Sequence, residues 1–115
     1  MVSKITLEEL RAELDSGARV TLVEALSEPY HRKQHLPGAI NIPHDRVDEL
    51  AATRLPDKDA SIVVYCANGP CQNSGIAAQR LMELGYRDVR DYHEGKEEWI
   101  EAGLPTESGR TAVEV

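Results

Sequence analysis

The sequence predicts a single α/β domain whose mostly parallel sheet has four or five strands and helices on both faces. Short runs rich in β-branched residues alternate along the chain with helix-like stretches, as in α/β proteins. The run 61–66, SIVVYC, is apolar without alternation, which is typical of a parallel strand buried on both faces. The length of 115 residues fits one domain, 1–115.

The first element is a helix at 6–16. Thr6 and Glu9 fit a capping box at its start. Leucines at spacings of three and seven residues form one apolar stripe, and Gly17 follows as a stop signal. We therefore expect an amphipathic helix that packs its leucine stripe on the sheet.

Two short strands, at 19–25 and 39–43, come next. The first contains two Val and the second two Ile, and the second stops at Pro43. The segment 27–38 between them is polar and irregular, with room for one turn of helix. A short helix is expected at 44–53, where apolar side chains recur at helical spacing.

The second half of the domain repeats the strand-to-helix order. After the buried strand 61–66, a helix is expected at 73–84, with Asn73 or Ser74 as its N-cap. A strand at 88–92 and a last short helix at 94–103 complete the pattern, and the tail from residue 107 is expected to be mobile.

Composition excludes several classes of partner. Twenty acidic against 13 basic side chains give a net charge of −7, which disfavours nucleic acid and anionic membranes. No run of eighteen apolar residues occurs, and the first residues lack an apolar leader. Two cysteines are too few for a disulfide framework. We expect a soluble cytoplasmic protein with no nucleic-acid or membrane partner.

Cys66 is the strongest candidate for a reactive group. The buried strand delivers it to the carboxyl edge of the sheet, where open α/β sheets bind ligands. The next helix begins a few residues later, and its N-terminal amides and dipole favour a thiolate. Gly69 and Pro70 curl the intervening loop into a shape that can hold an anion. The alternative is that Cys66 only fills the core at the strand end.

Four segments in register resemble the rhodanese domain. They are HLPGAINIP at 35–43, IVVYC at 62–66 with its loop and Ala-Ala helix, LGY at 84–86, and GKEEWIEAGLP at 95–105. The resemblance covers about residues 4–106. It implies a rhodanese-like three-layer sandwich around a central, mostly parallel five-stranded sheet, with 107–115 as a tail.

The resemblance also implies a sulfurtransferase activity. Cys66 would carry sulfane sulfur as a persulfide and pass it from a small-molecule donor to cyanide or to a thiol, either small or on a protein. The resemblance implies neither a cofactor nor a metal. The residues expected to bind the persulfide and its donor are those of the loop and first helical turn: Ala67, Asn68, Gly69, Pro70, Gln72, Asn73 and Ser74.

The loop departs from the family pattern. It is about two residues longer than usual, and no side chain in 67–78 is charged. Thiosulfate is a dianion whose recognition favours a cation, so the sequence favours a persulfide or another small sulfur donor. His93 and Lys96 are the nearest candidate cations, and Glu24 stands where the family often has Asp.

Cys71 leaves three further interpretations open. Five residues after Cys66, it could resolve a persulfide or sulfenic acid as a disulfide, which would make the protein a thiol-disulfide redox protein. It could also be the sulfur acceptor itself, or a small side chain packed under the loop. Besides the sulfurtransferase and the redox protein, the third class of function left open is a non-catalytic rhodanese-like binding module.

Two other cysteine chemistries are disfavoured. Phosphatases of similar loop shape have an arginine six residues after the cysteine, and here Gln72 follows Cys66 at that spacing. A structural zinc site needs four ligands, and the two cysteines have no second close pair among the scattered histidines His31, His35, His44 and His93.

Overall fold

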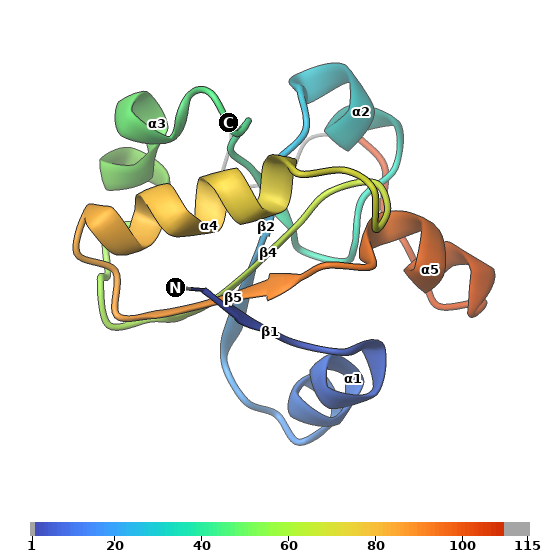
Figure 1. Ribbon diagram of the computed structural model, residues 1–115. Coiled ribbons are helices and arrows are strands. Elements are labelled where there is room, and N and C mark those ends of the chain that lie inside the picture. The colour runs from blue at the N-terminus through green and yellow to red at the C-terminus, as the bar shows by residue number, and fades with distance from the viewer. Residues whose placement is uncertain (1, 110–115) are drawn as a thin grey trace.

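The computed structural model describes residues 2–109, and Figure 1 shows how its elements are layered. The strands are β1 (Ser3–Lys4), β2 (Val20–Glu24), β3 (Ile40–Asn41), β4 (Ser61–Tyr65) and β5 (Asp88–Tyr92). The helices are α1 (Leu7–Asp15), α2 (Glu28–Lys33), α3 (Val47–Arg54), α4 (Asn73–Glu83) and α5 (Gly95–Glu101).

The strands form one five-stranded sheet in the order β1-β5-β4-β2-β3, with every neighbouring pair parallel. β4 occupies the centre, where Val63 lies in register with Leu22 of β2 and with Arg90 of β5. Its last four residues are fully buried. The prediction of a parallel sheet with a doubly buried central strand is confirmed.

Helices cover both faces of the sheet, as predicted. Side chains of successive strand residues point to opposite faces, so Ile62 and Val64 join the core under α3 and α4. Val63 and Tyr65 join the core on the other face, with Leu10 of α1 and Trp99 of α5. Figure 1 shows α3 and α4 on one side of the sheet and α1 on the other.

Two elements differ from the sequence-based expectation. The two-residue strand β1 was not predicted, and it completes the sheet edge by pairing with β5. The segment 27–38, where one turn of helix was expected at most, contains the six-residue helix α2. It starts after Ser27 with Pro29 in its first turn, a position where proline is compatible with a helix. The capping box of α1 is confirmed: Thr6 and Glu9 bond each other's backbone.

The expected cap of α4 was wrong. Its N-cap is Gln72, with no side-chain cap hydrogen bond, whereas Ser74 lies inside the first turn and is fully buried. The backbone of Gln72 already has helical angles (φ −97°, ψ −2°). The cap therefore lies one or two residues earlier than predicted, whereas the helix itself begins at residue 73, as expected.

The chain end also differs from the expected tail. Glu107 and His35 exchange two backbone hydrogen bonds of 2.8 Å each, and the amide of Gly109 donates to the carbonyl of Arg32. Residues 107–109 are therefore attached to the domain, and the rest of the predicted tail lies outside the described residues. Within 2–109, no helix combines the length and the apolarity needed to cross a bilayer.

Candidate active site

Cys66 lies directly after the central strand β4 and is fully buried. Its carbonyl accepts a 2.8 Å hydrogen bond from the amide of Lys96, and the carbonyl of Ala67 accepts one of the same length from Glu97. These amides belong to the first turn of α5, where backbone N–H groups have no partner within the helix. The cysteine is thus held between the central strand and a helix about 30 residues later in the sequence.

Gly95 makes this close approach between α5 and the loop feasible. Its φ of +79° lies in the left-handed region, and a Cβ there would stand 2.6 Å from the carbonyl oxygen of Cys66. It would also lie 2.9 Å from backbone atoms of Ala67 and Asn68. Sequence reasoning missed this role, although a glycine at the start of a short helix was its available signal.

The sulfur of Cys66 is surrounded by the loop and by the first turn of α4. Sγ lies 3.4 Å from the carbonyl oxygen of Cys71, 3.9 Å from that of Asn68 and 3.6 Å from Oγ of Ser74. Among the predicted loop residues, these three contact the sulfur. The structure gives no hydrogen bond to it from the others, namely Ala67, Gly69, Pro70, Gln72 and Asn73.

The local environment raises the pKa of the Cys66 thiol. Burial is the main cause, and the neighbouring Cys71 thiol raises the pKa further, whereas the hydroxyl and amide of Ser74 lower it. The first turn of α4 does favour the thiolate through Ser74, as expected, but burial outweighs this effect, so the expected lowering of the pKa of Cys66 is not found. The reason is that burial disfavours the charged form of the thiol, and the neighbouring Cys71 thiol adds to this effect.

Asn68 organises the loop between the two cysteines. Its carbonyl oxygen and its side-chain Oδ1 each accept from the amide of Cys71 at 3.1 Å. Its Nδ2 donates to Oε2 of Glu97 at 3.2 Å. The amide of Cys71 is thus occupied, and the loop is tied to α5 by a side chain as well as by backbone.

Neither candidate cation serves the sulfur. Nζ of the nearly buried Lys96 donates to both carboxylate oxygens of Glu24, at 3.1 and 3.2 Å, and to two carbonyl oxygens of the α2 region. Tyr65 also donates to Glu24, at 2.8 Å. His93 faces Asp91, with Nδ1 3.9 Å from Oδ2. Lys96 therefore compensates a buried carboxylate, and Glu24 is its partner.

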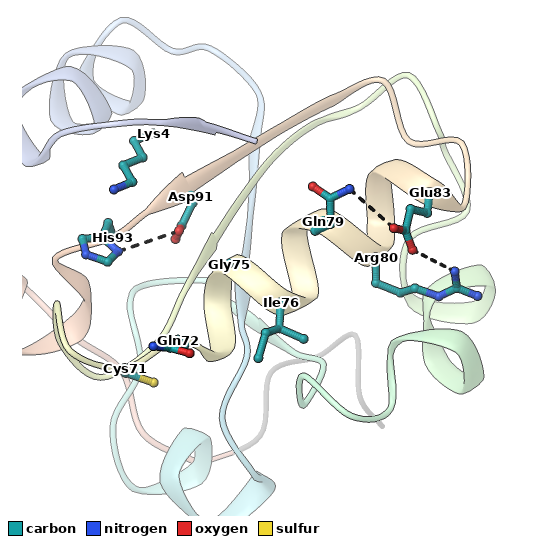
Figure 2. A pocket seen from close by; sticks show the side chains of 10 residues that line it. All are labelled: Lys4, Cys71, Gln72, Gly75, Ile76, Gln79, Arg80, Glu83, Asp91 and His93. Atoms are coloured by element: carbon teal, nitrogen blue, oxygen red, sulfur yellow. Dashed lines mark hydrogen bonds and ion pairs between the residues drawn. The ribbon is translucent and has the colours of Figure 1, made fainter. Parts of the chain in front are cut away.

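A groove of about 600 Å³ lies beside this loop (Figure 2). Cys71 and Gln72 form its end nearest the loop, and the remaining walls come from α4, β1 and β5. Cys66 does not line it. Within residues 2–109, no cluster of three or more His, Cys, Asp or Glu side chains is arranged to hold a metal ion.

Comparison with known proteins places this geometry in a family. The model of the rhodanese-like domain matches residues 6–102. The chain is 43% identical to the thiosulfate sulfurtransferase PspE of Escherichia coli over 61 residues, which are 53% of this chain and 57% of that protein. It is 35% identical to an HTH-type transcriptional regulator of Mycobacterium tuberculosis over 105 residues, covering 91% of this chain and 45% of the regulator.

The fold agrees with these matches. A human single-domain sulfurtransferase superposes with a TM-score of 0.72 at 30% identity, covering 88% of this chain and 97% of that one. The chain spans about half the length of the two curated relatives, one of which is named an enzyme and the other a regulator. The sequence-based identification is confirmed, and the chain belongs to the rhodanese-like domain family.

Proposed function

We propose that the protein is a sulfurtransferase that carries sulfane sulfur as a persulfide on Cys66. The observation that carries the proposal is the position of this thiol. It lies at the carboxyl end of the central strand, enclosed by a loop that α5 holds by two backbone hydrogen bonds. Relatives named sulfurtransferases support the same activity.

The first step requires the thiolate of Cys66. The thiolate attacks the outer sulfur of the donor, an S–S bond to Cys66 forms, and the bond between that sulfur and the rest of the donor breaks. Oγ of Ser74 lies 3.6 Å from Sγ of Cys66. Its hydroxyl is therefore suited to donate a hydrogen bond to the thiolate. Because burial raises the pKa of the thiol, the thiolate is a minor species at neutral pH.

The surroundings of the loop favour an uncharged or weakly charged donor over thiosulfate. The Glu94 carboxylate approaches Gly69, where a Cβ would lie 3.5 Å from Oε1, and Glu97 bonds Asn68. Lys96 is engaged with Glu24. A dianion that approached the loop would therefore meet two carboxylates, and Lys96 would not compensate them. We expect a persulfide to be a better donor than thiosulfate.

Intact-mass spectrometry tests the proposal. Incubation with a persulfide donor should add one sulfur, about 32 Da, to the wild type and to Cys71→Ser, and none to Cys66→Ser. An adduct that survives Cys66→Ser but is lost in Cys71→Ser would show that Cys71 is the carrier. Thiols that take no sulfur from any donor in the folded protein would support a binding module instead.

A disulfide between the two cysteines is a second candidate chemistry. The observation that favours it is that the thiols of Cys66 and Cys71 are neighbours. Oxidation would release two protons and two electrons to a thiol oxidant such as a small disulfide. Mild oxidation should then lower the mass by about 2 Da without any sulfur gain under a persulfide donor. Sulfur gain with the donor and no disulfide on oxidation would exclude this candidate.

A further inference from the structure

Asp91 of β5 has a buried carboxylate oxygen without a hydrogen-bond partner in the described part of the chain. Its side chain is 7% exposed, and Oδ1 has no hydrogen-bond partner among residues 2–109. Oδ2 lies 3.9 Å from Nδ1 of His93, which is too far for a hydrogen bond. A buried carboxylate oxygen without a hydrogen-bond partner is costly. Such a group is expected where a ligand supplies the missing partner.

The carboxylate belongs to the wall of the groove described above. Figure 2 shows Asp91 and His93 side by side, with Lys4 beside them and α4 forming the opposite wall. A Cβ on Gly75, in the first turn of α4, would lie 3.6 Å from Oδ2 of Asp91. The absence of a side chain at Gly75 therefore leaves room directly in front of the carboxylate.

Lys4 supplies a second charge to the same groove. It pairs with Asp91 in the register of β1 and β5, so both side chains stand on the same face of the sheet. Among the described residues, no ion pair or hydrogen bond of its ammonium group is found. The other cation of the groove, Arg80, is bound to Asp48 and Glu83. One carboxylate and one ammonium thus remain for a ligand.

The groove lies close to the reactive sulfur. Gly75 follows Ser74, whose hydroxyl is 3.6 Å from Sγ of Cys66. Cys71 and Gln72 close the groove at its loop end. A ligand held by Asp91 and Lys4 would therefore have one end at the wall of the sulfur-carrying loop.

We propose that this groove binds a free α-amino acid thiol of the cysteine type as the sulfur acceptor. Its ammonium group binds Asp91, its carboxylate binds Lys4, and its thiol points toward the loop. This inference rests on the proposed sulfur transfer. The acceptor thiolate attacks the outer sulfur of the Cys66 persulfide, and the bond from that sulfur to Cys66 breaks. Cys66 leaves as a thiolate and takes up the proton that the acceptor lost, so no net oxidation occurs.

A binding experiment tests the groove independently of any reaction. S-methyl-L-cysteine cannot accept sulfur, and titration followed by NMR should give a saturable shift of the His93 imidazole. Asp91→Asn should weaken this binding about tenfold or more, and Lys4→Met should weaken it a few-fold, as for an exposed charge. Asp59→Asn is the matched control, because that carboxylate is paired with Arg87 and neither residue lines the groove, and it should leave binding unchanged.

Kinetics with a matched set of thiols tests the acceptor role. L-cysteine has both charges, cysteamine lacks the carboxylate, 3-mercaptopropionate lacks the ammonium, and 2-mercaptoethanol lacks both. With the Cys66 persulfide preloaded, kcat/KM should be highest for L-cysteine. Asp91→Asn should remove the advantage that L-cysteine and cysteamine have over the two thiols without an ammonium group. It should leave persulfide loading of Cys66 unchanged. The loading readout separates this role from a structural one.

The outcomes distinguish the two proposals. If Cys66 takes up no sulfur, the proposed function fails, whatever S-methyl-L-cysteine does. If Cys66 loads normally but S-methyl-L-cysteine does not bind saturably, or Asp91→Asn keeps the preference for L-cysteine, the groove proposal is overturned. Should Asp91→Asn not fold, Lys4→Met at the exposed sheet edge must still lower the preference for L-cysteine over cysteamine.

Discussion

Gly95→Ala is the substitution whose effect on the cysteine loop can be worked out most directly. Two separate penalties act at this residue. Its φ of +79° is unfavourable for any residue with a Cβ, and the new methyl group would lie 2.6 Å from the carbonyl oxygen of Cys66. Gly103→Ala is the matched control, because Gly103 has a φ of +76° and no atom within 4 Å of its would-be Cβ.

The two variants differ by the close contact alone. Left-handed backbone at a residue other than glycine costs roughly 1–2 kcal/mol, which is the whole expected effect of Gly103→Ala. Overpacking against backbone adds about 1–3 kcal/mol. We therefore expect Gly95→Ala to lower the free energy of unfolding by roughly 2–5 kcal/mol in total. The clash can be relieved by moving the Cys66–Asn68 backbone away from α5.

Urea unfolding measures the stability loss, and the rate of persulfide loading measures the loop displacement. Gly95→Ala should unfold at a clearly lower urea concentration than Gly103→Ala. It should also load sulfur onto Cys66 more slowly at a temperature where both variants are folded. Equal destabilisation by the two substitutions, with equal loading rates, would refute the claim that the contact between α5 and the loop positions the cysteine.

Three further predictions concern the thiol and the buried charges. Because burial raises the pKa of Cys66, its alkylation rate should rise about tenfold per pH unit and level off only above the ordinary thiol pKa of about 8.5; a plateau below pH 8 would contradict this. Ser74 lowers that pKa, so Ser74→Ala should shift the alkylation profile further toward high pH, which the same titration measures. Lys96→Met leaves Glu24 buried without its cation and should lower the free energy of unfolding by about 3–5 kcal/mol, measured by urea denaturation. Arg46→Met removes an exposed ion pair and is the control expected to show little change.

The position of Cys66 could be predicted from the sequence because it depends on a single segment of the chain. The uninterrupted apolar run 61–66 determines a central strand, and the strand end determines where Cys66 lies. β1 was missed because two residues, Ser3 and Lys4, form no pattern on their own and become a strand only beside β5.

The chemistry of the sulfur depends on contacts that no local pattern contains. Sequence spacing places Cys66 near a helix start, but it does not show that the carbonyl of Cys71 turns toward the sulfur. Similarly, Lys96 and Glu24 are 72 residues apart, and only the packing of α5 on the sheet joins them. Asp91 was recognisable in the sequence as unusual, because it is a polar residue at a position where the alternation of its strand predicts burial.

The two hydrogen bonds from α5 to the carbonyls of Cys66 and Ala67 have a consequence for folding during synthesis. The amide donors, in Lys96 and Glu97, follow the cysteine by 30 and 31 residues, and chains emerge from the ribosome N-terminal end first. For the time needed to add those residues, the thiol exists in a chain that cannot yet close over it. The nascent chain therefore exposes to solvent a cysteine that the finished domain buries. Protection of this thiol from oxidants begins only when the last helix docks.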